Sequence, residues 1–130
     1  SSTFYQACFH QLAGQVLNCL TVNTHLPLDD VLRLYRDVDS FQNSLPAFFF
    51  AAQPSWFDFA RHRLAWRLDN LRMVILRQTF LKGSLASGPV TPEEERCWGK
   101  CVDCAAEVIR SVQRFTSSGS RCMMELWYAL

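Results

Sequence analysis

The chain has 130 residues, of which 49% are apolar and 13% aromatic, and its formal net charge is +1 with both signs mixed along the sequence. This length suits a single domain that buries roughly two-thirds of its unfolded surface. A near-neutral charge argues against direct nucleic-acid contact, which usually needs a concentrated basic face. No apolar run reaches the roughly 18 residues of a membrane span, and the first residues do not form a signal peptide, so we expect no membrane contact.

Helical periodicity predicts two helices in the first third of the chain. The first runs from Phe4 to Val22, with Ser2 or Thr3 as its N-cap. Its apolar face consists of Tyr5, Cys8, Phe9, Leu12, Val16, Cys19 and Leu20. The second begins near Leu28, just after Pro27, and is ended by Pro46. Its buried side consists of Val31, Leu34, Tyr35, Val38 and Leu45.

The segment from Trp56 to Leu81 is apolar on two opposite faces when it is drawn as a helix. One stripe consists of Phe57, Leu64, Leu68, Leu71 and Ile75, and the opposite one of Phe59, Trp66, Met73 and Phe80. A surface helix needs only one apolar stripe. We therefore expect this helix, capped by Ser55 and ending near Gly83, to be packed from both sides at the centre of a multi-layer all-α domain.

Charged residues are expected on the flanks of this central helix. Its five arginines scatter around the axis, and Asp58 and Asp69 are close enough to pair with some of them: Arg61, Arg63, Arg67, Arg72 and Arg77. A scattered set of arginines does not form the single stripe that nucleic acid needs, so we interpret them as flanking charges.

A strong start signal opens a fourth helix. Thr91 is suited to the N-cap, Pro92 to the first helical position, and Glu94 to the third position of a capping box. The pattern continues to about Phe115. Residues 121–130 then begin a fifth apolar helix that the chain end interrupts. We therefore expect residues 1–130 to be one all-helical segment of a larger helical domain.

Three of the six cysteines have the spacing C-x3-C-x2-C, which recurs in radical enzymes that hold an iron–sulfur cluster: Cys97, Cys101 and Cys104. Here they share one helical face with Val108, Val112 and Phe115, whereas a cluster needs ligands on a loop. Asp103 also stands where those enzymes prefer an aromatic residue. We interpret the thiols as reduced packing residues. A radical iron–sulfur enzyme fragment and a zinc site are disfavoured, and no cofactor is expected in this chain.

No catalytic grouping is visible along the sequence. His10, His25 and His62 lie in three different elements, and Asp58, four residues before His62, explains that histidine as half of a local helix pair. There is no glycine-rich phosphate loop and no HExxH motif. We predict that the chain is not an enzyme.

The chain carries a large apolar surface. Three consecutive phenylalanines in a connection would be an aggregation hazard if exposed. With the second stripe of the central helix they form a candidate packing or partner surface: Phe48, Phe49, Phe50, Phe59, Trp66, Met73 and Phe80. We expect it to be covered by the fifth helix or the remaining helices of the domain, by a second copy of the chain, or by an amphipathic helix of a regulatory protein.

Four segments, in order, resemble one protein family: LPAFF, PSWFDFARHRLAWRLDNLRMVILRQTFL, CVDCAAEVI and MELWYAL. They are similar to the middle homology region of fungal binuclear zinc-cluster (Zn2Cys6) transcription factors, the family of the yeast galactose activator. The matching pattern R-x-x-x-L-R-x-x-x-L runs from Arg72 to Leu81. The chain departs from the family at Arg77-Gln-Thr-Phe-Leu, where R-P-F-L is common, and it lacks the cysteine cluster that binds DNA.

The resemblance implies a function at two levels. The parent protein would be a nuclear, sequence-specific regulator of RNA polymerase II transcription, with its zinc and its DNA-binding domain outside this chain. Residues 1–130 would belong to the fungal-specific regulatory domain, which controls activity through intramolecular, protein or small-metabolite contacts. The alternative is a structural helical scaffold or dimerisation module that binds no ligand.

Overall fold

The computed structural model describes residues 2–22, 26–47, 55–85 and 89–117, with the side chains of residues 3–22, 26–47, 60–79 and 89–117. These residues form four helices and no strand: α1 (Ser2–Val22), α2 (Leu28–Asn43), α3 (Ser55–Leu85) and α4 (Pro92–Ser117). The predicted all-α fold is confirmed. None of the four helices is long and apolar enough to cross a membrane. The expected fifth helix, over residues 121–130, lies outside the described residues.

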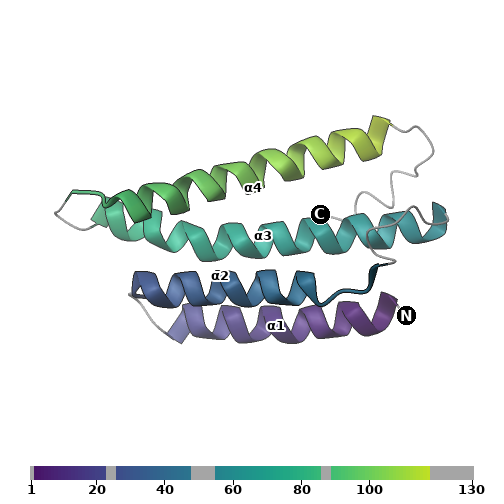
Figure 1. Cartoon of the computed structure of the whole chain (residues 1–130), viewed down its shortest axis with the longest axis horizontal. Coiled ribbons are helices and arrows are strands. Elements are labelled where there is room, and N and C mark those ends of the chain that lie inside the picture. The colour runs from purple at the N-terminus through teal and green to yellow at the C-terminus, as the bar shows by residue number, and fades with distance from the viewer. Residues whose placement is uncertain (1, 23–25, 48–54, 86–88, 118–130) are drawn as a thin grey trace.

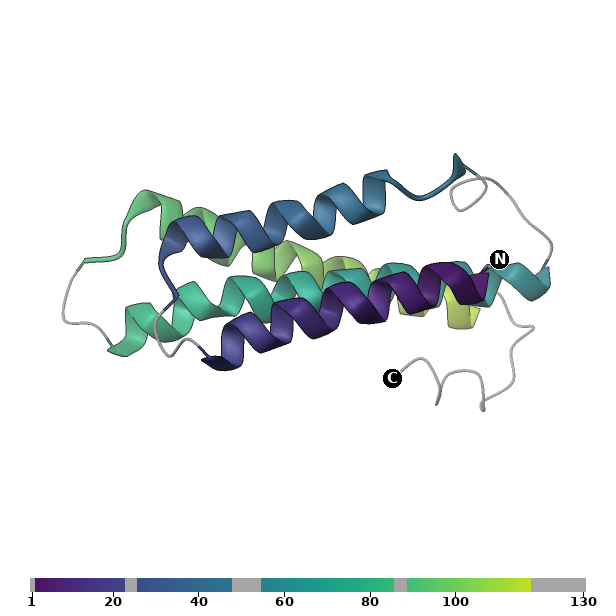
Figure 2. The ribbon, with the colours of Figure 1, turned by 90° about the horizontal axis from the view of Figure 1, so that it is seen from below.

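The long helix α3 lies at the centre of the arrangement and packs against all three other helices. In Figure 1, α4 lies along one side of α3, while α1 and α2 lie on the other. Figure 2, seen from below, shows α1 and α2 as two separate ribbons with α3 and α4 behind them. A single helix therefore supplies the contact surface for two layers, as its two apolar stripes predict.

One face of α3 builds the main hydrophobic core with α1 and α2. Each of these helices presents apolar side chains one helical turn apart, which places them on a single face. The core consists of Phe9, Val16, Leu26, Val31, Leu34, Val38, Leu45, Leu64, Leu68, Leu71 and Ile75. The predicted first stripe of the central helix is confirmed from Leu64 to Ile75. The predicted faces of α1 and α2 also lie in or against this core, except for Cys8, which is half-buried outside it.

The opposite face of α3 packs against α4. The Trp66 side chain is only 6% exposed, and Leu76, Cys97 and Phe115 are also buried. The Nε1 group of Trp66 donates a hydrogen bond of 2.8 Å to the Ser111 hydroxyl of α4. The Cys101 thiol lies 3.8 Å from the backbone carbonyl oxygen of Met73. The second stripe is thus covered by α4 at Trp66, whereas Met73, the other stripe residue with a described side chain, is half-buried.

Several helix ends differ from those predicted. Ser55 is the first residue of α3, so it is not the N-cap, and α3 continues past Gly83 to Leu85. α1 already begins at Ser2, so neither Ser2 nor Thr3 is its cap. α2 ends at Asn43, and Leu45 is buried beyond the helix. The proline at position 46 disfavours helical geometry at Leu45, and the Ser44 hydroxyl donates to the Phe41 carbonyl.

Thr91 caps α4 as predicted, because the Glu94 N–H donates a hydrogen bond of 3.2 Å to its hydroxyl oxygen. Replacing Thr91 by Ala should lower the free energy of unfolding by about 0.5–2 kcal/mol, since one N–H of the first turn loses its acceptor. Urea titration followed by circular dichroism measures this. Thr21→Ala, which removes a threonine hydroxyl from the last turn of α1, is the matched control. Equal losses in both variants would contradict the cap.

Candidate functional site

The residues predicted to form a partner surface are placed only in part. Phe48, Phe49 and Phe50 lie outside the described residues, and the side chains of Phe59 and Phe80 are not described. Trp66 is buried and Met73 is half-buried, both on the side of α3 that α4 covers. At Trp66 the surface is therefore covered by α4, a helix of the same chain. At this position the surface serves intramolecular packing.

Three aromatic side chains pack together where α3 meets α4: His62, Trp66 and Phe115. The rings of His62 and Trp66 are stacked, with their centroids 5.8 Å apart. The ring of Phe115 meets both of them edge-on, at 5.2 Å and 5.5 Å. Edge-to-face contacts of this kind add to the stabilisation from burial. His62 therefore belongs to the α3–α4 interface. The side chain of Asp58, its predicted partner, is not described.

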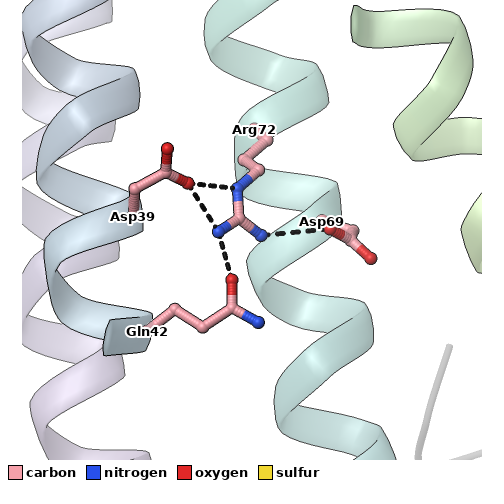
Figure 3. Close-up of polar contacts among 4 residues, drawn as sticks. All are labelled: Asp39, Gln42, Asp69 and Arg72. Atoms are coloured by element: carbon pink, nitrogen blue, oxygen red, sulfur yellow. Dashed lines mark hydrogen bonds and ion pairs between the residues drawn. The ribbon is translucent and has the colours of Figure 1, made fainter. Parts of the chain in front are cut away.

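A buried arginine lies at the centre of the polar contacts between α2 and α3 (Figure 3). Arg72 is 6% exposed. Its Nε and Nη2 atoms donate to the same Asp39 oxygen, at 3.1 Å and 2.8 Å, and its Nη1 donates to Asp69 at 3.1 Å. Nη2 also donates to the side-chain oxygen of Gln42. We call Asp39, Gln42, Asp69 and Arg72 the arginine cluster.

The position of Arg72 corrects the expectation of purely flanking charges. Its predicted pairing with an aspartate of the same helix is confirmed at Asp69, but its side chain is buried and joins α3 to α2. Burial of an ion pair is tolerated when hydrogen bonds satisfy the remaining donors. Arg67 instead faces α1, where it donates to Gln6 at 3.1 Å and lies 3.2 Å from His10 Nε2.

Tyr35 extends the arginine cluster toward α4. The guanidinium carbon of Arg72 is 5.9 Å from the centre of the Tyr35 ring, and the Lys100 ammonium of α4 is 5.0 Å from it. Cations at these distances are attracted by the electrons of the ring face. Burial, followed by the charge of Asp39, raises the pKa of Tyr35. Polar contacts at this point therefore join three helices.

Asp69 is held in a poorly solvated position. Burial raises its pKa above the ordinary 3.8, and the charge of Arg72 opposes this shift. The folded protein therefore holds the Asp69 proton more tightly than the unfolded chain does. Through this group alone, the free energy of unfolding declines as the pH rises through the range just above 3.8.

A hollow of about 220 Å³ opens between the end of α2 and α3. Apolar side chains line part of it and polar ones the rest: Gln42, Leu45, Arg61, His62, Leu64, Ala65 and Leu68. We call it the α2–α3 hollow. Gln42 is common to this hollow and to the arginine cluster, so a molecule in the hollow would touch a hydrogen-bond partner of Arg72.

Sequence reasoning placed Tyr35 on the buried side of α2 but missed Asp39 and Gln42. Tyr35, Asp39 and Gln42 are spaced four and three residues apart, which places them on one face beside the buried stripe of Val31, Leu34 and Val38. Polar residues in a row at the edge of an apolar face could have predicted a cationic side chain on the neighbouring helix. Which cation this is, namely Arg72, depends on how α2 packs against α3.

The three cysteines of α4 lie on the side that packs against α3. Cys97 is buried, and Cys101 and Cys104 are half-buried. Burial raises the pKa of all three thiols. A raised pKa disfavours the thiolate, which is the form that binds metals and reacts with electrophiles. Within the part of the chain that the structure describes, no three metal-ligating side chains come together.

Replacing Cys101 by Ala should lower the free energy of unfolding by about 1 kcal/mol, because the thiol acts as a small apolar group at the α3–α4 contact. The ultraviolet–visible spectrum should stay the same, and metal analysis of both proteins should find no stoichiometric iron or zinc. Gln113→Ala, at an exposed position on the same helix, is the control for helix stability. Bound iron that disappears in the Cys101→Ala protein would contradict the packing role.

No protein-family model matches the chain, and curated proteins and solved structures show no significant match either.

Proposed function

We propose that this chain is a regulatory module of a fungal zinc-cluster transcription factor, a non-catalytic helical domain that responds to contacts with a small metabolite or a protein. The family assignment depends on the four sequence segments that resemble the middle homology region. The chain itself is proposed to bind no metal and no DNA, and the parent protein to act in the nucleus.

One structural observation supports a responsive role, namely that Gln42 belongs both to the α2–α3 hollow and to the arginine cluster. A ligand that accepts a hydrogen bond from Gln42 Nε2 would draw this side chain toward the hollow and pull its Oε1 acceptor away from Arg72. The Arg72 guanidinium is the polar link between α2 and α3, so the loss would shift how these helices pack. Energetic coupling of this kind needs a ligand that binds one packing state better than the other.

The chemistry of the hollow indicates the kind of effector. Leu45, Leu64 and Leu68 offer an apolar wall, and Arg61 and His62 offer polar groups that suit an anion. Sites for small molecules are usually lined mainly by apolar side chains, with a few polar groups that fix the orientation of the ligand. The volume is small, so we propose a small organic acid as the effector.

A reporter assay tests the regulatory role. The chain is inserted between a heterologous DNA-binding domain and an activation domain in yeast. We expect reporter output to fall when the chain is present and to recover when Arg72→Leu loosens the bundle. Arg33→Leu, at an exposed site on α2, should leave the repression in place. Output that does not change when the chain is inserted would instead favour a structural scaffold.

A binding assay tests the metabolite response separately. Thermal unfolding is recorded with a panel of small mono- and dicarboxylic acids, because a ligand that binds only the folded state raises the melting temperature. We expect at least one acid to stabilise the protein and Gln42→Ala to abolish the effect. Gln113→Ala, an exposed position on α4, is the matched control. The same shift in all three proteins would mean binding elsewhere.

A further inference from the structure

The side of α4 that faces away from the rest of the bundle carries an apolar face of its own. Val102 is 67% exposed and Ile109 is 59% exposed, although both are large apolar residues. They are seven residues apart, so they lie on the same face of the helix, about one-third of a turn from the cysteines that pack against α3. In Figure 1, α4 is the outermost helix on its side of α3.

The residues between these two are small. Ala105 and Ala106 lie midway between Val102 and Ile109, and Gly99 extends the same face toward the start of α4. A side chain added at Gly99 would meet no other atom within 4 Å. Small residues in the middle of a helix face let a second helix backbone come close. We call Gly99, Val102, Ala105, Ala106 and Ile109 the α4 outer face.

We propose that the α4 outer face is a self-association surface, on which the α4 helices of two copies of this chain pack antiparallel about a two-fold axis. Such an interface must be complementary to itself. An axis between Ala105 and Ala106 meets this condition, because Val102 and Ile109 are equally far from it. Each Val102 then packs against Ile109 of the second copy, and the alanines meet at the centre.

The charges at the edge of this face favour the antiparallel direction. Asp103 and Arg110 lie along the same edge, on opposite sides of the proposed axis. Antiparallel pairing therefore brings each Asp103 within reach of Arg110 of the second copy, whereas parallel pairing places this edge of the two copies on opposite sides of the interface and leaves both charges without that partner. Arg110 is 3.2 Å from Glu107 in the single chain, and Arg114 is 2.9 Å from the same carboxylate. Glu107 thus keeps a partner when Arg110 turns away.

A hollow beside Val102 gives the second copy a place to bind. It has a volume of about 310 Å³, its exposed lining is apolar, and it lies between α3 and α4 among Leu76, Arg77, Trp98, Cys101 and Val102. In the antiparallel pair, Ile109 of the second copy lies over Val102, next to this hollow. An aliphatic side chain held in an apolar pocket is one kind of interface anchor.

This inference goes beyond the proposed function, because it depends only on α4 and holds whether or not the chain regulates transcription. One helix pair makes an interface at the small end of the known range, so we expect a dissociation constant of about 10 μM. Sedimentation equilibrium between low micromolar and millimolar protein should therefore show a monomer–dimer equilibrium.

Two single charge reversals, Asp103→Arg and Arg110→Asp, provide the sharpest test. Each variant alone places like charges together twice in its own dimer, so each should dimerise at least about tenfold more weakly than the original chain. Mixed in equal amounts, the two variants should form a heterodimer, because both pairs are then attractive. Native mass spectrometry separates the species by mass.

The matched controls are Asp37→Arg and Arg36→Asp, two exposed positions on α2. They should leave the dissociation constant unchanged and should show no preference for each other when mixed. Val102→Asp should abolish the dimer, and circular dichroism confirms that each variant remains helical.

Three results would overturn the proposal. One is a monomer at every concentration. Another is a dimer whose dissociation constant is unchanged by both charge reversals. The third is a chain shortened after Ser117 that dimerises while the full chain does not, since residues 118–130 would then occupy the α4 outer face themselves.

Discussion

Replacing Leu68 by Ala should lower the free energy of unfolding by about 2–5 kcal/mol, because a large side chain is removed from the middle of the packed α3 face. Leu68 is 1% exposed and lies in the core that α1, α2 and α3 share. The side chains around Leu68 belong to three helices, so they cannot all move inward to fill the cavity that the substitution leaves. The same range is expected for Leu71→Ala, and urea unfolding measures both.

The control for this substitution is Leu17→Ala, which makes the same chemical change at an exposed site on α1. It should cost less than about 0.5 kcal/mol. Losses of that small size at both Leu68 and Leu71 would show that this face of α3 is not packed.

Replacing Arg72 by Leu should cost about 1–3 kcal/mol at neutral pH, because Asp69 and Asp39 lose a hydrogen-bonded partner, although their side chains are 21% and 44% exposed and keep some contact with water. Asp69 would keep its poorly solvated position, and Asp39 and Gln42 would lose their contact with α3. Arg72→Lys should recover only part of the loss, since a single ammonium group cannot reproduce the fork of the guanidinium.

The double variant Arg72→Leu with Asp69→Asn separates charge from packing. If the loss arises from an uncompensated carboxylate, the added substitution should recover a measurable part of it. Arg77→Leu, an exposed arginine on the same helix, is the control. Equal losses for Arg72→Leu and Arg77→Leu would mean that the arginine cluster contributes nothing.

The helical periodicity of the sequence was sufficient to predict the fold class and the central position of α3. Leu64, Leu68 and Trp66 repeat at helical spacing on opposite faces, and only a helix with neighbours on both sides can bury both sets. Helix ends were less predictable. Gly83 is a residue that often ends a helix, yet α3 continues to Leu85, which shows that a local preference of about 1 kcal/mol is easily overridden.

The site was much less predictable than the fold. The sequence places Arg72 near Asp69, because the two are three residues apart, but nothing local relates Arg72 to Asp39, which is 33 positions away. That contact depends on the register between α2 and α3. The same holds for Trp66 and Ser111, whose hydrogen bond joins helices that periodicity alone cannot align. Helix faces follow from sequence spacing, whereas pairs across helices follow from packing.

The central position of α3 also has a consequence for the order of folding. α3 and α4 are consecutive in the chain and make the most extensive helix–helix contact, whereas α1 must reach α3 across the whole of α2. Closing the shorter loop costs less entropy, so the α3–α4 hairpin is the natural nucleus. Until α1 and α2 dock, that hairpin exposes Leu64, Leu68 and Ile75 to water. We therefore expect the species most prone to aggregation to be the α3–α4 hairpin, in which the α3 face that later forms the core is still exposed.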